Sequence, residues 1–269
     1  MTPRIAIPVP TTADLAYNQR SWPSYSRAVI SAGGEPVQID IAASPAAIRA
    51  LISTCDGVLL PGSPADVDPA LYGQERDPAT SPADPAREQA DRILLEDAEA
   101  HAKPVLGICY GVQSINVWRG GSLVQDLTPL PVNHEAGSKV AVAHAALVAP
   151  DSLLASLLDP SEAPTSGDYL RLPINTSHHQ SVAAPGEGLR IVARCPDDGV
   201  IEAVELDEDA KLFHVEQSAE QSGHLWFLLG VQRHPERSYE ISAASRALFA
   251  RLIAEARTYS TRSSLAHSS

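Results

Sequence analysis

Apolar positions follow two alternating spacings along the first 118 residues, and each spacing predicts one kind of element. Short unbroken apolar runs, typical of strands buried on both faces, lie at 4–9, 36–41, 57–61 and 103–108. Apolar residues at helical spacing fill the gaps, at 21–32, 45–54, 85–102 and 112–118. A strand–helix–strand order of this kind predicts a parallel sheet with right-handed crossovers.

Turn and cap residues support these boundaries. Ser44 precedes Pro45 at the start of one helix, and Gly120 with Gly121 ends another. The segment 62–84 is rich in Pro, Asp, Ala and Gly and reads as a long loop. It follows the end of a strand, where open α/β sheets build their sites, so we expect it to be functional.

After residue 121 the pattern changes to short, half-exposed strands. We expect such strands at 123–124, 139–148, 172–175, 188–195 and 199–206, as antiparallel additions to the sheet. Asp151 is expected to cap a short helix over 152–158, and the polar stretch 207–224 is expected to be a loop. A buried strand at 226–232 and a closing helix at 239–257 complete a single α/β domain over 1–258, with a disordered tail at 259–269.

Composition and charge narrow the class of protein. The chain has 269 residues and a formal net charge of −13, which argues against nonspecific binding to nucleic acid or to an anionic membrane surface. Its three cysteines are too few for a disulfide framework and fit a reducing compartment. The N-terminus has no signal-peptide core, and no apolar stretch approaches the ~20 residues of a membrane helix, so we expect a cytoplasmic protein.

Cys109 is the best candidate nucleophile. It lies between the strand at 103–108 and the following helix, in the sequence Gly-Ile-Cys-Tyr-Gly over 107–111. This is a cysteine version of the nucleophile elbow, in which small neighbours permit a strained turn that exposes the reactive side chain. The unpaired N–H groups and the dipole at a helix N-terminus favour the thiolate.

His234 and Glu236 are the best candidates for a base and its orienting carboxylate. His234 follows the buried strand at 226–232, and Glu236 lies two residues further on. Residues two apart in an extended chain share a face, so the carboxylate can orient the imidazole. The sequence therefore predicts a Cys–His–Glu triad of nucleophile, base and orienter.

The motifs resemble those of class I glutamine amidotransferase domains, and in particular of the gamma-glutamyl-gamma-aminobutyrate hydrolase group. GICYGVQ at 107–113 and HPE at 234–236 carry the first resemblance. LLPGSPADVDPALYG at 59–73, NVWRGGSLVQD at 116–126 and NTSHHQ at 175–180 carry the second. The resemblance spans roughly residues 4–257. It implies a flavodoxin-like three-layer sandwich and a role in polyamine catabolism, such as putrescine degradation.

The resemblance also implies a reaction. Cys109 would attack the gamma-carbonyl of a small gamma-glutamyl amide, and His234 would carry the proton to the departing amine. Water would then release glutamate from the thioester. The resemblance assigns the oxyanion hole to backbone N–H groups of Tyr110, Gly62 and Ser63, and substrate binding to Gln113, Ser177, His178 and His179. No cofactor is implied.

Three departures from the group's pattern bear on the leaving amine. Tyr110 stands where Arg is usual, Arg233 stands where Trp is usual, and the stretch 207–224 is longer than usual. We expect all three near the leaving-group side of the pocket. Arg233 or Arg119 is a candidate partner for a distal carboxylate of the substrate.

Other polar residues were weighed and set aside. His178 and His179 point to opposite faces if extended, and Asp66 with Asp68 lacks a complete ligand set, so no metal site is expected. His134, His144, His214 and His224 receive no role, and Cys55 and Cys195 are expected to be small buried hydrophobes.

Two alternatives to free hydrolysis remain open at this stage. The chain could be a glutaminase subunit that supplies ammonia to a separate synthetase, or a non-catalytic binder of a gamma-glutamyl metabolite. A homodimer is a reasonable expectation because most soluble oligomers are symmetric dimers.

Overall fold

The computed structural model describes residues 2–207 and 226–266. Within them the main sheet has ten strands, in the order β2 (Glu35–Ile39), β1 (Arg4–Pro8), β3 (Gly57–Leu60), β4 (Val105–Ile108), β12 (Leu228–Val231), β11 (Ile201–Leu206), β10 (Leu189–Arg194), β6 (His144–Val148), β8 (Tyr169–Ile174) and β7 (Thr165–Ser166). The first five strands pair in parallel and the rest pair antiparallel. A two-stranded antiparallel sheet, β5 (Ser122–Val124) with β9 (Ser181–Ala184), packs beside it.

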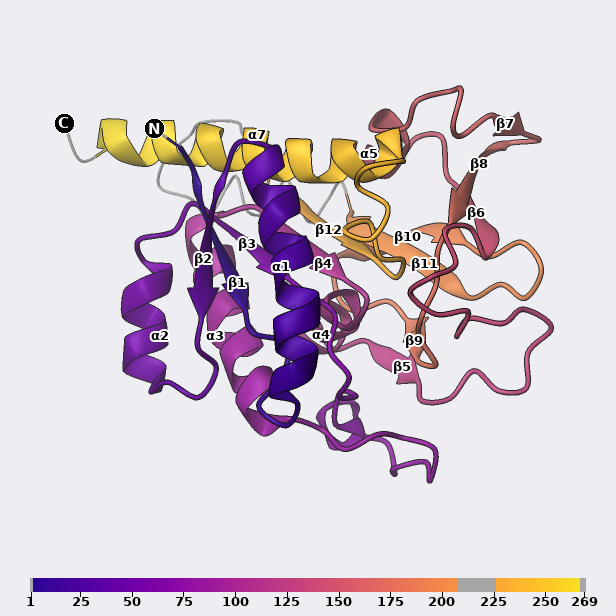
Figure 1. Ribbon diagram of the computed structural model, residues 1–269, viewed down its shortest axis with the longest axis horizontal. Helices are drawn as coiled ribbons and strands as arrows, with labels where there is room; N and C mark the ends of the chain where they lie inside the picture. The colour runs from indigo at the N-terminus through magenta and orange to yellow at the C-terminus, as the bar shows by residue number, and fades with distance from the viewer. Residues whose placement is uncertain (1, 208–225, 267–269) are drawn as a thin grey trace.

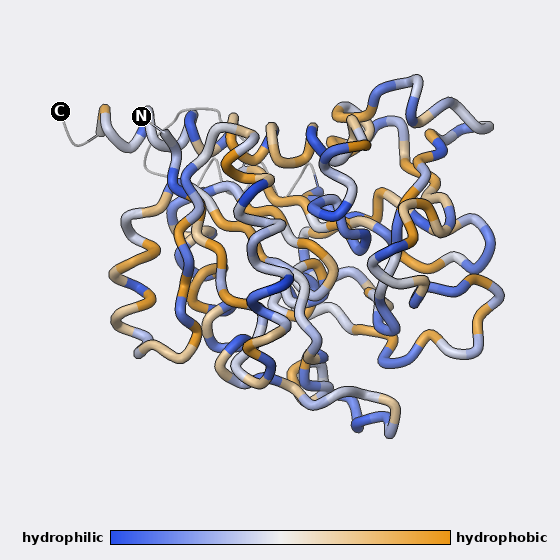
Figure 2. The backbone as a smooth tube through the Cα atoms, in the orientation of Figure 1, coloured by the Kyte–Doolittle hydropathy of each residue, from blue (hydrophilic) through white to orange (hydrophobic). Residues whose placement is uncertain are grey.

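Helices cover both faces of the parallel half, giving three layers (Figure 1). One face packs against α1 (Leu15–Ser31) and α7 (Ala243–Ala266), through buried residues such as Val29 and Leu252. The other face packs against α2 (Pro45–Ile52), α3 (Pro85–His101) and α4 (Tyr110–Trp118). The central strands β3, β4 and β12 are buried along their whole length, and Figure 2 shows hydrophobic segments concentrated in the middle of the molecule. The flavodoxin-like α/β sandwich with antiparallel additions is therefore confirmed.

Several predicted boundaries were wrong. α1 begins at Leu15 rather than at residue 21, because Asp14 caps it and Pro23 lies inside it without ending it. A proline normally breaks a helix interior, which is why the sequence favoured a later start. Ser152, not Asp151, caps α5 (Leu153–Ser156). β6 begins at His144, five residues later than expected.

The C-terminal part also differs from expectation. α7 begins at Ala243 and continues to Ala266, so most of the tail expected to be disordered is helical. The expected loop at 207–224 lies outside the described residues, apart from residue 207. In the long loop 62–84 the structure adds a short 3-10 helix, η1 (Pro69–Tyr72). Among the described helices, none has both the length and the apolar character needed to cross a bilayer.

Candidate functional site

Cys109 occupies the predicted strained turn between β4 and α4. Its backbone has φ 54° and ψ −109°, in the region that disfavours residues with a side chain. Gly107 and Gly111, two residues to either side, allow the close packing around this turn: a Cβ on Gly111 would collide with the carbonyl oxygen of Leu60 in β3. The Cys109 N–H donates to Val231 O at 2.9 Å, which ties the elbow to β12. The elbow therefore has the geometry that a nucleophile requires.

The sheet topology brings His234 to Cys109. β12 pairs in parallel with β4, with Val231 opposite Ile108, so both strands end at the same edge. A Cβ built on Gly62 would lie 3.1 Å from His234 Cε1 and 3.6 Å from Cys109 Cβ. Gly62 thus lies against both residues. The close approach of the three explains why a glycine is needed at position 62.

Glu236 orients the imidazole as predicted. His234 Nδ1 lies 2.8 Å from Glu236 Oε1, and both side chains are about 2% exposed. Burial alone would lower the pKa of His234, but the charges of Glu236 and Cys109 raise it to about 9. Burial likewise opposes ionisation of Glu236, yet the charge and hydrogen bond of His234 lower its pKa. The pair therefore favours an imidazolium beside a carboxylate.

Asn175 holds the backbone of His234 in place, a role that the sequence analysis did not assign. Its Nδ2 donates to His234 O at 2.8 Å, and its Oδ1 accepts the His234 N–H at 2.8 Å. Asn175 is buried and lies immediately after β8. Its place in the NTSHHQ motif was visible, but no sequence signal connected that motif with His234.

The expected oxyanion hole needs one revision. The Gly62 N–H donates to the hydroxyl of Tyr25 at 3.0 Å, so in this conformation it is not a free donor. Tyr25 is buried in α1, and burial raises its pKa well above the usual value. The Tyr110 N–H belongs to the first turn of α4, where N–H groups have no helical partner. The assignment of Tyr110 and Ser63 as oxyanion donors stays a prediction.

The residues expected near the leaving amine make contacts with neighbouring elements of the scaffold. The Tyr110 side chain is buried between α3 and α4, with the Arg87 guanidinium 4.7 Å above its ring. Arg233 is buried and donates from Nη1 to Ser245 Oγ of α7 at 2.8 Å. Arg119 pairs with Glu99 at 3.0 Å. These side chains contact the scaffold, and a place for Tyr110 and Arg233 on the leaving-group side of the pocket stays a prediction, as does the pairing of Arg233 or Arg119 with a distal carboxylate.

The expected substrate-binding residues are held by scaffold contacts. Gln113 Nε2 donates to Gln180 O at 2.9 Å and to Gln232 Oε1 at 3.2 Å. The His178 N–H donates to His134 O at 2.9 Å, and His179 Nε2 lies 3.0 Å from Asp66 Oδ2. Ser177 is half-buried. Their substrate contacts stay predictions. Asp66, which was not expected to bind a metal, instead pairs with His179 and accepts the Ser81 N–H within the long loop.

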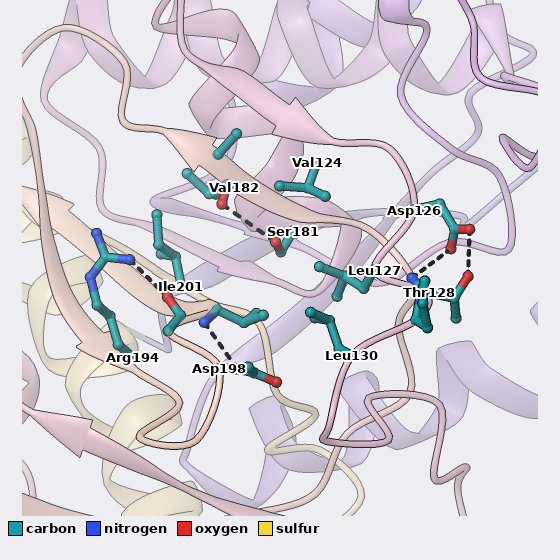
Figure 3. A pocket seen from close by; sticks show the side chains of 14 residues that line it. Val124, Asp126, Leu127, Thr128, Leu130, Ser181, Val182, Arg194, Asp198 and Ile201 are labelled. Atoms are coloured by element: carbon teal, nitrogen blue, oxygen red, sulfur yellow. Dashed lines mark hydrogen bonds between the residues drawn. The ribbon is translucent and has the colours of Figure 1, made fainter.

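A separate pocket of about 370 Å³ opens between the small sheet and the β10–β11 turn (Figure 3). Val124, Leu127, Ser181 and Ile201 line it, and Arg194 and Asp198 lie at one side. Its lining does not include Cys109, His234 or Glu236. We therefore place the candidate site at the elbow and not in this pocket.

Comparison with known proteins identifies the family of this chain. Residues 10–236 match the Peptidase C26 family. The chain is 33% identical over 234 residues to the gamma-glutamyl-gamma-aminobutyrate hydrolase of Escherichia coli, covering 84% of this chain and 82% of that protein. It is 32% identical over 231 residues to protein NtpR of Enterococcus hirae, covering 84% of each.

The fold also matches a solved structure. The glutaminase domain of Trypanosoma brucei CTPS with bound acivicin superposes with a TM-score of 0.56 at 16% identity, over 96% of this chain and 94% of that one. At this identity the match shows the fold alone. The extent of the family match, together with the relatives above 30% identity, decides the assignment: this chain is a member of the Peptidase C26 family.

Proposed function

We propose that the chain is a cysteine hydrolase that cleaves the amide bond of a small gamma-glutamyl compound. The observation that carries the proposal is the strained Cys109 beside the His234–Glu236 pair. The gamma-glutamyl specificity rests on the motifs and on a relative named as a gamma-glutamyl-gamma-aminobutyrate hydrolase. A substrate derived from a polyamine fits the same resemblance.

The proposed reaction has two steps. The Cys109 sulfur attacks the gamma-carbonyl carbon, and His234, carrying the thiol proton, donates it to the nitrogen as the C–N bond breaks and the amine leaves. Water then attacks the thioester, giving a proton to His234, and the C–S bond breaks to release glutamate. Backbone N–H groups of Tyr110 and Ser63 are proposed to stabilise the oxyanion in both steps. Losing one such donor costs ~3–4 kcal/mol in comparable enzymes.

A panel of gamma-glutamyl amides tests the proposal. Purified protein is incubated with the gamma-aminobutyrate, putrescine, ethylamine and anilide derivatives and with glutamine, while glutamate release and the intact protein mass are followed. We expect release of glutamate from at least one compound and a transient gamma-glutamyl adduct on Cys109. Cys109→Ala should remove both. Turnover that survives in Cys109→Ala, or no cleavage and no adduct with any compound, would contradict the proposal.

The same panel addresses the glutaminase alternative. A subunit that serves a separate synthetase should favour glutamine and turn over slowly without its partner. A stand-alone hydrolase should instead cleave a gamma-glutamyl amine faster than glutamine. We favour the second outcome because the family match and the named relative point to hydrolysis.

A further inference from the structure

A second cluster of buried titratable side chains lies under the antiparallel half of the sheet. It contains His134 from the loop after β5, His144 at the start of β6, His178 after β8 and Glu202 in β11. All four side chains are at least nine-tenths buried. Neither the catalytic proposal nor the sequence analysis gives His134, His144 or Glu202 a role.

The unpartnered atoms of this cluster are the key observation. His134 Nδ1, His144 Nε2, His178 Nε2 and both carboxylate oxygens of Glu202 are buried without a hydrogen-bond partner among the described residues. Buried polar atoms are almost always paired, so a group of them at one place needs an explanation. Glu202 Oε1 lies 3.6 Å from His134 Nδ1 and 3.6 Å from His144 Nε2, too far for a hydrogen bond to either.

The opposite nitrogen of each histidine fixes its tautomer. His134 Nε2 lies 2.8 Å from the Asp198 carboxylate, His144 Nδ1 lies 3.2 Å from Ala145 O, and His178 Nδ1 lies 2.9 Å from Gln180 O. These oxygens only accept, so each facing nitrogen carries the proton and the inner nitrogen of a neutral ring has a lone pair. With Glu202 ionised, the inner face of the cluster presents lone pairs from the imidazoles and from the carboxylate. Burial raises the pKa of Glu202, and a bound cation would favour its ionised form. A single water can donate only two hydrogens, whereas a cation can satisfy three acceptors at once.

The separations fit a metal ion. His134 Nδ1, His144 Nε2 and a Glu202 oxygen all lie within 4.8 Å of one another. A tetrahedral Zn²⁺ with bonds of about 2.0–2.2 Å separates neighbouring ligand atoms by roughly 3.4 Å, close to the 3.6 Å found here. A carboxylate or carbonyl on the outer nitrogen of each histidine is the usual support for such ligands.

We propose that His134 Nδ1, His144 Nε2 and Glu202 bind a divalent transition-metal ion of the Zn²⁺ class. The His178 ring lies beside these ligands, with its centroid 5.0 Å from that of His134, but it is not one of the proposed ligands. The proposal does not depend on the catalytic role of Cys109.

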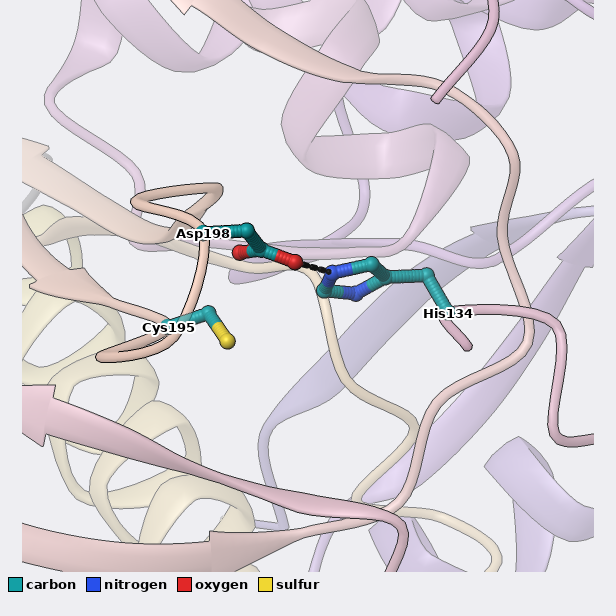
Figure 4. A group of neighbouring side chains, drawn as sticks. All are labelled: His134, Cys195 and Asp198. Carbon is teal, nitrogen blue, oxygen red and sulfur yellow. Dashed lines mark hydrogen bonds and ion pairs between the residues drawn. The ribbon is translucent and has the colours of Figure 1, made fainter. Parts of the chain in front are cut away.

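A second possible ligand group, His134 with Cys195 and Asp198, is less suitable. Figure 4 shows the outer edge of the His134 ring directed at Asp198, with Cys195 on the same side. This edge already makes a direct 2.8 Å bond to the carboxylate, which leaves no room for an ion between the two atoms. The His134 edge that faces Glu202 has no such bond.

A surface pocket and a buried arginine lie next to the cluster. The pocket, of about 550 Å³, is lined by Asn133, His144 and Asp197, so it reaches one of the three proposed ligands. The nearby Arg233 directs its Nη1 to Ser245 and makes no ion pair with Glu202 among the described residues. Its positive charge interacts with Glu162, Glu236 and Glu202, so an ion at the cluster would share the Glu202 charge with this guanidinium.

The ion would also stabilise the segment 175–179, which lies beside the candidate active site. The carbonyl oxygen of His134 accepts both the His178 N–H at 2.9 Å and the Thr176 hydroxyl at 2.8 Å. An ion that fixes His134 to β6 and β11 would thereby fix the segment 175–179, which also carries Asn175 and so the backbone of His234.

Metal content and cobalt binding test the proposal on the full chain. Protein purified without chelator is analysed by inductively coupled plasma mass spectrometry, and chelator-treated protein is titrated with Co²⁺ while its visible spectrum is recorded. We expect about one Zn²⁺ per chain and a Co²⁺ spectrum without a thiolate charge-transfer band. Mg²⁺, which prefers oxygen ligands, should not compete. A native protein that takes up neither ion at this stoichiometry would overturn the proposal.

Variants locate the ion. Asp198 orients His134, and the loss of such a residue typically lowers metal affinity by about 10–100-fold. We expect Asp198→Asn to lose Co²⁺ affinity by this factor, and His144→Ala and Glu202→Gln, which remove a ligand, to lose more. His101→Ala changes an exposed histidine and is the matched control. Cys109→Ala and Cys195→Ser should bind Co²⁺ as the native protein does. Loss of binding in either cysteine variant, or a thiolate band, would place the ion elsewhere and overturn the assignment. The titration of the native protein tests the proposal by itself, so the proposal can be overturned even if a variant fails to fold.

Discussion

At the scale of single residues, the elbow and its partners were the most predictable part of the molecule. Gly107, Cys109 and Gly111 carry a local signal, since only small neighbours allow a side chain at φ 54°. His234 and Glu236 could be paired because they lie two residues apart. Tyr25 and Asn175 could not be assigned, because their contacts at Gly62 and His234 join residues 37 and 59 positions apart.

The raised pKa of His234 predicts the alkaline limit of activity. An imidazolium with a pKa of about 9 is protonated below that value, so it can protonate the leaving amine at neutral pH and loses this ability as the pH rises through about 9. Glu236→Gln removes the largest charge that raises this pKa. We therefore expect the alkaline limb of the kcat/KM profile, which reports the free enzyme, to move to lower pH, with kcat reduced by roughly 10²–10⁴-fold.

The measurement is kcat/KM and kcat against pH for both proteins with one gamma-glutamyl substrate. Glu96→Gln, an exposed change on α3, serves as the control and should leave the profile unchanged. An alkaline limb that stays in place in Glu236→Gln would show that Glu236 does not set the pKa of His234.

At the scale of elements, the sequence predicted strands that have continuous hydrophobic runs. It failed where contacts with distant residues determine whether a strand forms or where a helix ends. The parallel strands are buried on both faces, so their apolar runs identified them. β9 was missed because two of its four residues are exposed and its partner, β5, has only three residues. α7 continues past its predicted end because helix propensity in a polar segment gives no clear stop.

The contact between α4 and β3 predicts that Gly111 tolerates no side chain. A Cβ at this position would meet the backbone of Leu60, which cannot move without displacing β3. We expect Gly111→Ala to lower the free energy of unfolding by about 1–3 kcal/mol, as overpacking typically does. It should also reduce turnover, because α4 carries the nucleophile at its N-terminus. Urea unfolding and kcat are measured together.

Gly120→Ala is the control at the other end of α4. Gly120 has φ 79° and no atom within 4 Å of a built Cβ, so the change adds backbone strain without a collision. We expect a loss of about 1–2 kcal/mol with turnover retained. Equal loss of turnover in both variants would show that the fit of α4 against β3 is not what positions Cys109.

At the scale of the whole molecule, a buried ion pair joins the first strands to the third helix. Arg87 is fully buried and donates from Nε to Asp91 at 2.7 Å. Its Nη1 donates to Pro10 O at 3.0 Å and its Nη2 to Pro61 O at 2.7 Å, so one side chain ties the ends of β1 and β3 to α3. The sequence predicted the helix but not this pair, since a charged residue in an amphipathic segment is normally placed on the solvent face.

Breaking this pair should destabilise the entire fold. Arg87→Met leaves the Asp91 carboxylate buried without its partner, and we expect a loss of about 3–5 kcal/mol in the free energy of unfolding. Arg92→Met on the same helix breaks an i,i+4 pair with the same 2.7 Å separation, but an exposed one, and should cost less than ~1 kcal/mol. The double variant Arg87→Met/Asp91→Leu should recover part of the loss, because no buried charge then remains unpaired. The free energy of unfolding of all three variants is measured by urea unfolding. Similar decreases for Arg87→Met and Arg92→Met would mean that burial does not set the strength of the Arg87–Asp91 pair.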